Sequence, residues 1–121
     1  MTHSVLIVDD ETDVAAASAA ILEEEGYRVA VASDGAEALE LLRGGLRPCV
    51  ILLDLMMPIM DGAQFRRAQT ADPAIADIPV VVLSGIAAWG GPIGAMNVAG
   101  CFRKPVDWDR VLGTVSALCP C

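Results

Sequence analysis

The sequence predicts a three-layer α/β fold in which helices cover both faces of a parallel sheet. Short β-branched and aliphatic runs alternate along the chain with longer segments of helical periodicity. Two of the runs, 49–53 and 79–83, are apolar almost throughout, which is typical of strands buried on both faces of a parallel sheet. Strands that alternate with helices are joined by right-handed crossovers, so neighbouring strands are expected to run parallel.

Five runs are expected to form the strands of this sheet. They are 4–8 (SVLIV), 27–32 (YRVAVA), 49–53 (CVILL), 79–83 (PVVVL) and 101–103 (CFR). With helices between them, they predict a flavodoxin-like (βα)5 three-layer sandwich, a five-stranded parallel sheet of order 2-1-3-4-5 with helices on both faces. The 121 residues suit a single domain over 1–121.

Each helix is expected to turn an apolar stripe toward the sheet. Asp34 and Glu37 have the spacing of a capping box, and Asp61 and Asp107 can cap two further helices. The fourth helix is expected to be short or late, because glycines interrupt residues 87–100. The expected stripes, in chain order, are Val14, Ala17, Ser18, Ile21 and Leu22; Ala38, Leu41 and Leu42; Phe65 and Ala68; and Trp108, Val111, Leu112, Val115 and Leu118.

Composition excludes several classes of function. The net charge is −8, with 16 acidic residues against 8 basic ones, which argues against direct binding of nucleic acid. No apolar run is long enough to span a bilayer, and residues 1–11 do not resemble a signal peptide, so we expect no membrane partner and a cytoplasmic location. The four cysteines lack the paired spacing of a zinc site and are expected to be free thiols; the closing CPC is a weak metal or redox signal.

Polar and charged residues follow four of the five expected strands. Because the carboxyl ends of parallel strands meet at one edge of a sheet, these residues are expected to converge there. Lys104 is the only lysine among the eight basic residues, and it would bring a compact cation to that edge. The residues that follow strands one, three, four and five are Asp9-Asp10-Glu11, Asp54, Ser84-Gly85 and Lys104-Pro105.

Four motifs, in order and at compatible spacing, resemble the receiver (CheY-like) domains of two-component response regulators. They are VLIVDDE, ILLDLMMPIMDG, VVLSG and FRKP. The resemblance spans residues 4–118. It implies that Asp54 is the phosphoacceptor of a phosphorelay, modified by a sensor histidine kinase or a histidine phosphotransfer protein, and that phosphorylation switches binding to a downstream protein. It also implies a phosphorylatable switch that is not a turnover enzyme.

The resemblance further implies a Mg²⁺ site. Its ligands would be Asp9, Asp10, Asp54 and the backbone carbonyl of Met56, with Asp9 acting mainly through a bound water. Ser84 would donate its hydroxyl to a phosphoryl oxygen, and Lys104 would pair with the acyl phosphate or with Asp54. Physical reasoning agrees, because clustered carboxylates repel one another and a hard divalent cation relieves that repulsion.

Alternative functions remain open. The chain could be a degenerate receiver that acts as a constitutive interaction module. An aspartyl-phosphate phosphohydrolase generally has a second Asp two positions after the nucleophile, where this chain has Met56. A flavin- or nucleotide-binding module would need a phosphate loop after the first strand, where this chain has Asp9-Asp10-Glu11.

One departure from the receiver pattern lies at Cys101, where receivers usually have an aromatic switch residue; the adjacent Phe102 is expected to point to the other face. We therefore expect that the coupling between phosphorylation and partner binding, as far as it runs through position 101, is weak or altered.

Overall fold

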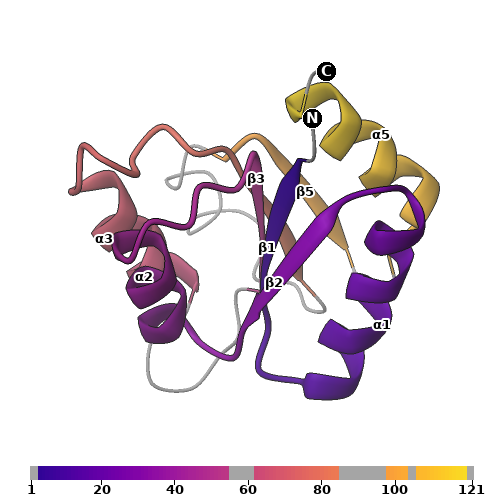
Figure 1. Ribbon diagram of the computed structural model, residues 1–121, viewed down its shortest axis with the longest axis horizontal. Coiled ribbons are helices and arrows are strands. Elements are labelled where there is room, and N and C mark those ends of the chain that lie inside the picture. The colour runs from indigo at the N-terminus through magenta and orange to yellow at the C-terminus, as the bar shows by residue number, and fades with distance from the viewer. Residues whose placement is uncertain (1–2, 55–61, 85–97, 104–105, 120–121) are drawn as a thin grey trace.

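The computed structural model describes residues 3–54, 62–84, 98–103 and 106–119. Its five parallel strands form one sheet of order β2-β1-β3-β4-β5, so the predicted fold class and strand order are confirmed (Figure 1). The strands are β1 (Ser4–Val8), β2 (Arg28–Ala32), β3 (Val50–Asp54), β4 (Val80–Ser84) and β5 (Gly100–Arg103).

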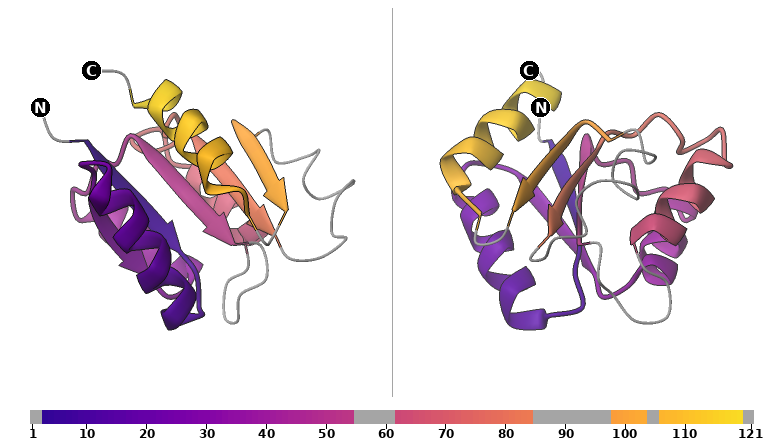
Figure 2. Two further views of the ribbon diagram at one scale, coloured as in Figure 1. Left: turned by 90° about the vertical axis from the view of Figure 1, so that its right-hand side faces the viewer. Right: turned by 180° about the vertical axis from the view of Figure 1, so that it is seen from behind.

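Four helices in the described part of the chain cover the two faces of the sheet (Figure 2). The helices α1 (Thr12–Glu24) and α5 (Trp108–Leu118) cover one face, and α2 (Gly35–Arg43) and α3 (Gly62–Thr70) cover the other. Residues 87–97 of the segment in which the fourth helix is expected lie outside the described residues. Among the described helices, none has both the length and the apolar character that a bilayer-spanning segment requires.

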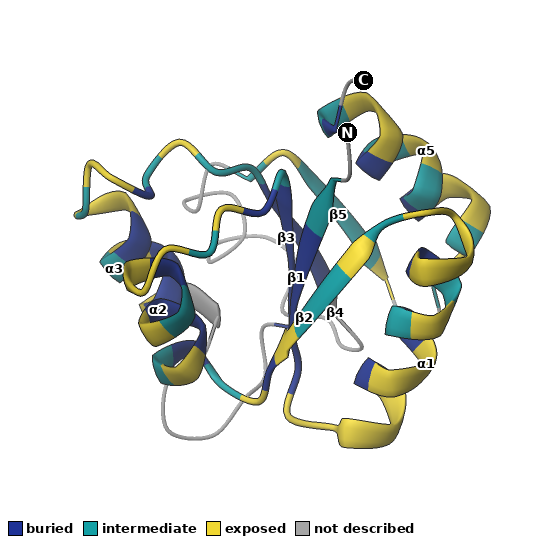
Figure 3. Ribbon diagram, viewed as in Figure 1, coloured by how far each residue is buried: buried dark blue, intermediate teal, exposed yellow. Residues whose placement is uncertain are grey.

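Alternation along each strand divides the buried side chains into two cores. In β1, Val5 and Ile7 pack on the α1/α5 side, whereas Leu6 and Val8 pack on the α2/α3 side. The same alternation runs along β3 and β4, and the strands in the centre of the sheet are buried on both faces (Figure 3). Both faces are apolar because both are covered by helices.

The predicted inward stripe of α1 is wrong in part. Val14 is 37% exposed and Ala17 is exposed, while Ala15, Ser18 and Leu22 are buried against the sheet. The segment TDVAAASAAILEE is rich in alanine, so its sequence has little contrast between an apolar and a polar face. Only the burial of Ser18 and Leu22 agrees with the expected stripe.

The predicted starts of α2 and α5 are confirmed by their N-terminal caps. The backbone N–H of Glu37 donates to Asp34 Oδ1 (2.8 Å), and the Glu37 side chain accepts from the backbone N–H of Ser33 (3.1 Å). The side chain of Asp107 accepts from the backbone N–H of Asp109 (3.1 Å). Asp61, the expected cap of α3, lies outside the described residues.

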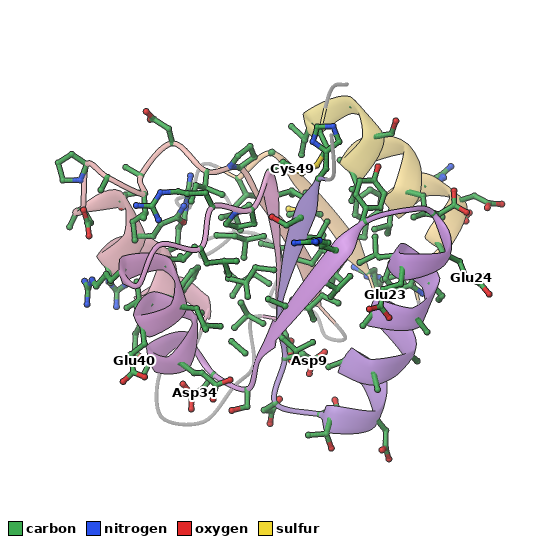
Figure 4. The ribbon with its side chains drawn as sticks, viewed as in Figure 1. Asp9, Glu23, Glu24, Asp34, Glu40 and Cys49 are labelled. Atoms are coloured by element: carbon green, nitrogen blue, oxygen red, sulfur yellow. A yellow bond between two sulfur atoms is a disulfide. The ribbon has the colours of Figure 1, made fainter. Side chains whose placement is uncertain are left out.

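The expectation of free thiols is wrong for two of the four cysteines. Cys49, directly before β3, and Cys119, directly after α5, form a disulfide with their Cα atoms 5.4 Å apart. Cys49 lies at the end of the sheet opposite Asp9 (Figure 4). The fold brings these cysteines together across 70 residues, so no local spacing in the sequence could reveal the pair. Cys101 is free, as expected, and Cys121 lies outside the described residues.

Candidate functional site

The candidate site lies at the carboxyl edge of the sheet, where β1 and β3 end side by side. The register pairs Val8 with Leu53, so Asp9 and Asp54 occupy equivalent positions on neighbouring strands. Asp54 is the last residue of β3, and the β4 residue paired with it is Leu83. Parallel pairing therefore brings together carboxylates that are 45 positions apart in the sequence.

Asp9, Asp10 and Asp54 form one acidic cluster. Each offers a carboxylate oxygen, and these three oxygens lie within 4.8 Å of one another. Asp9 and Asp54 are buried, with 5% and 6% of their surface exposed, whereas Asp10 is exposed. The cluster thus combines two buried carboxylates with one that faces solvent.

The start of α1 orients Asp9. Its backbone N–H donates to the carbonyl of Ala32 (3.0 Å), and its side-chain Oδ1 accepts from the backbone N–H of Glu11 (2.9 Å). Glu11 is the N-cap residue of α1, and its own side chain makes no capping bond. The carboxylate of Asp9 is therefore fixed by the turn that leads from β1 into α1, next to the positive end of the helix dipole.

The donor set of the cluster fits a hard divalent cation. Burying neighbouring carboxylates is costly because the charges repel one another away from water. Magnesium and calcium ions take oxygen ligands, and magnesium commonly binds through one or two carboxylates while it keeps several waters. Two buried carboxylates with an exposed third beside them match that requirement.

The remaining predicted site residues are described only in part. Ser84 is the last residue of β4 and pairs with Arg103 in the register of β4 and β5, but its side chain is outside the description. Lys104 and Met56 also lie outside the described residues. The structure therefore brings together Asp9, Asp10 and Asp54 of the predicted set.

Cys101 and Phe102 point to opposite faces of β5, as predicted. Cys101 packs with the α2/α3 core, and Phe102 packs with the α1/α5 core. Burial raises the pKa of the Cys101 thiol above its ordinary value, because the charged thiolate is desolvated. A small neutral group therefore occupies the position where the resemblance implies an aromatic residue.

A cavity beside the acidic cluster was not predicted from the sequence. Asp9 and Asp54 line it together with Ser18 of α1 and Trp108 of α5. From the sequence, Ser18 and Trp108 are expected only as members of helical stripes. Ser18, a hydroxyl residue on the expected inward stripe of an alanine-rich helix, is the one sequence signal that could have indicated this cavity wall.

The parallel five-stranded sheet and the acidic cluster at its carboxyl edge define a signalling domain of the receiver class. Residues 5–116 match the family model of the response regulator receiver domain, and the chain belongs to this family, whose members act as signalling switches.

Two curated relatives and one solved structure illustrate the similarity. Protein PilH of Pseudomonas aeruginosa is 33% identical over 119 residues, covering 94% of this chain and 95% of PilH. Protein Rrf1 of Nitratidesulfovibrio vulgaris is 30% identical over 115 residues, covering 95% of this chain and 81% of Rrf1. The structure of chemotaxis protein CheY4 of Vibrio cholerae superposes with a TM-score of 0.87 at 28% identity, covering 98% of this chain and 99% of CheY4.

Proposed function

We propose that this chain is a single receiver domain, residues 1–121, that accepts a phosphoryl group on Asp54 in a Mg²⁺-dependent reaction. The observation that carries the proposal is the acidic cluster, in which Asp54 ends β3 with Asp9 and Asp10 beside it. Nucleophilic attack requires an ionised carboxylate held in place, and the backbone of a buried strand holds Asp54 in this way.

The reaction transfers a phosphoryl group from the imidazole of a phosphohistidine. A carboxylate oxygen of Asp54 attacks phosphorus, the P–N bond breaks, and the departing imidazole nitrogen takes up a proton. Asp9, Asp10, Asp54 and the backbone carbonyl of Met56 would hold Mg²⁺, and Asp9 would act mainly through a bound water. When bound, the ion neutralises the negative charge that develops on the phosphoryl oxygens.

Ser84 and Lys104 complete the proposed site. The Ser84 hydroxyl donates a hydrogen bond to one phosphoryl oxygen, and the Lys104 ammonium pairs with the acyl phosphate. Ser84 ends the strand next to β3, and Lys104 directly follows β5, so both belong to the same edge of the sheet. A compact ammonium suits this place better than a planar guanidinium because it acts as a point charge.

The proposed partners are proteins. A sensor histidine kinase or a histidine phosphotransfer protein supplies the phosphoryl group, and phosphorylation changes binding to a downstream protein target. The receiver family favours protein partners, and the net charge of −8 argues against direct contact with nucleic acid. We place this switch in the cytoplasm and assign it no turnover of an external substrate beyond gain and loss of its own phosphoryl group.

Phosphorylation by a small-molecule phosphodonor tests the proposal. Purified protein is incubated with the donor and Mg²⁺, and the base-labile, hydroxylamine-sensitive label is located by mass spectrometry. We expect label on Asp54, no label without a divalent cation, and no label on Asp54→Asn. Lys104→Ala and Ser84→Ala are expected to lower the extent or rate of labelling while cation binding persists.

A charge-matched control separates a specific loss from a general effect of charge. Asp13 is an exposed acid in the first turn of α1, outside the acidic cluster, so Asp13→Asn is expected to label like the wild type. Label that persists in Asp54→Asn would move the acceptor to another residue. Absence of any label, with the fold intact, would favour the alternative of a degenerate receiver that acts as a constitutive interaction module.

A further inference from the structure

The cavity beside the acidic cluster has the properties of a small-molecule site. It has a volume of about 270 Å³ and lies between α1, the sheet and the start of α5. Its walls are mostly apolar, formed by Ile7 and Leu52 from the sheet, Val14 from α1 and Trp108 from α5. An apolar cavity of about 150 Å³ in another protein holds a benzene ring, so this cavity has room for such a ring with a short polar arm.

Polar groups lie in the wall of this otherwise apolar cavity. Asp9 and Asp54 bring two buried carboxylates to it. Ser18 is the third polar residue; it is only 7% exposed, and its hydroxyl makes no hydrogen bond to any other residue that the structure describes. Because the Ser18 hydroxyl is accessible from the cavity, a ligand placed there can form a hydrogen bond with it.

The negative charge of the carboxylates beside the cavity favours a cationic ligand. Three carboxylates lie within 4.8 Å of one another, and even with the Lys104 ammonium that we propose for this edge, the acidic groups outnumber the basic one. In the absence of a divalent cation an anionic ligand would be repelled, whereas a protonated amine can bond to a carboxylate while its body fills the apolar walls.

We propose that this cavity binds a small organic amine, protonated and carrying an aromatic or compact aliphatic body. The ammonium group contacts Asp9 or Asp54, the Ser18 hydroxyl hydrogen-bonds to the polar end of the ligand, and the body packs among Val14, Leu52 and Trp108. Binding itself is independent of phosphoryl transfer. Competition between the amine and Mg²⁺ for the carboxylates is a further consequence, and that consequence rests on the proposed function.

Nuclear magnetic resonance tests this binding with matched probes. Phenethylamine is titrated into labelled protein in metal-free buffer, and phenylpropionate and phenethyl alcohol serve as probes of similar shape with a negative charge or none. We expect saturable shifts of the Trp108 indole N–H and the Ser18 amide with the amine, about tenfold weaker binding of the alcohol, and none of the carboxylate. No saturable shift with the amine, or equal binding of the carboxylate, would overturn the inference.

Two neighbouring alanines of α1 provide matched variants. Ala16 and Ala17 are both exposed, but only Ala17 lines the cavity. Ala17→Leu should obstruct the cavity and weaken phenethylamine by about tenfold, while Ala16→Leu should change it by less than about twofold. Equal weakening by both substitutions would overturn the inference. Ser18→Ala should weaken binding by about threefold, since one hydrogen bond is lost.

The outcomes for this cavity and for phosphorylation can be told apart. Amine binding without label on Asp54 would contradict the proposed function alone, and label on Asp54 without amine binding would contradict this inference alone. If both hold, added Mg²⁺ should raise the apparent dissociation constant of phenethylamine. An amine affinity unchanged by Mg²⁺ would show that the ammonium does not share the carboxylates with the ion, and would overturn the contact proposed for it.

Discussion

Asp10 is the exposed member of the acidic cluster, so it can be changed without leaving a buried group unpaired. Asp10→Asn removes one of three negative charges while it keeps the size of the side chain. We expect the affinity for Mg²⁺ to fall by about tenfold or more, because the loss of a residue that only supports a metal ligand already weakens metal binding by about that much. Isothermal titration of Mg²⁺ into both proteins measures the change, and Asp13→Asn serves as the control. Equal affinity in wild type and Asp10→Asn would contradict the assignment of Asp10 as a ligand.

The reactivity of the Cys101 thiol should depend on pH. Burial raises the pKa of its thiol, so the reactive thiolate is less populated at neutral pH than in an exposed cysteine. In Cys121→Ser without reductant, Cys101 is the one expected free thiol, because Cys49 and Cys119 are bonded. The rate of alkylation by iodoacetamide should rise with pH through a midpoint above that of the same protein in urea. A native midpoint equal to or below the urea midpoint would contradict this expectation.

Single residues of the site were predictable because strand ends converge. The run Val50–Leu53 marked a buried strand, and the carboxylate of Asp54 directly after it marked the edge of the sheet. The same logic placed Asp9 and Asp10. The cavity that Ser18 and Trp108 line could not be predicted, because it depends on how closely α1 and α5 approach the sheet.

The N-terminal cap of α2 is a prediction for a single element. Asp34 Oδ1 accepts the backbone N–H of Glu37, one of the donors that a helix leaves unsatisfied at its start. Asp34→Ala should lower the free energy of unfolding by about 1 kcal/mol. Urea denaturation measures the loss, and Asp34→Asn, which keeps an accepting oxygen, should restore most of it. Glu40→Ala, an exposed change on the same helix, should stay within about 0.5 kcal/mol of the wild type.

The contact between α3 and the segment before β4 depends on a buried amide. Gln69 is fully buried; its Nε2 donates to the carbonyls of Ile75 (2.9 Å) and Ile78 (3.0 Å), and its Oε1 accepts from Arg66 (2.8 Å). Gln69→Leu removes hydrogen bonds from the buried Ile75 carbonyl, the part-buried Ile78 carbonyl and the buried Arg66 side chain, and should cost about 2 kcal/mol in unfolding free energy. Gln64→Leu makes the same change at an exposed position of α3, where water can satisfy groups that lose a partner, and should cost less. Equal costs in urea denaturation would contradict the role of Gln69.

Helix prediction succeeded where polar residues fixed the ends and apolar residues fixed the face. In α5, Asp107 marks the start, and Val111 and Val115 are buried as expected. In α1, the alanines fit the core and the surface equally well, so the sequence could not specify the inward face and the prediction for Val14 failed. Tertiary packing decided the orientation of that helix.

At the scale of the whole molecule, the disulfide between Cys49 and Cys119 joins the start of β3 to the end of α5. Closing a loop of about 70 residues restricts the unfolded chain and stabilises the native state by about 4 kcal/mol in the chain-entropy account. Reduction should therefore lower the urea midpoint of the Cys121→Ser protein. The control is that protein with Cys49→Ser and Cys119→Ser added, whose midpoint should not respond to reductant. A midpoint unchanged by reduction would contradict the disulfide or its contribution.

The overall topology was predictable, but the covalent link across it was not. Alternation of apolar runs with helical segments determines a parallel sheet, and the strand order follows the expected pattern. The contact between Cys49 and Cys119 is a product of the completed fold. Pairing cysteines from the sequence would require the register of β3 and the length of α5 together.

The same bond divides the chain into a covalent ring and a free amino-terminal arm. The ring, residues 49–119, holds Asp54, whereas the arm carries β1, β2, Asp9 and Asp10. A divalent ion that binds all three carboxylates would link the amino-terminal arm to the ring. Because the complete set of ligands exists only while arm and ring are together, the binding free energy of the ion opposes their separation. Detachment of β1 from β3 should therefore become rarer as the concentration of the ion rises.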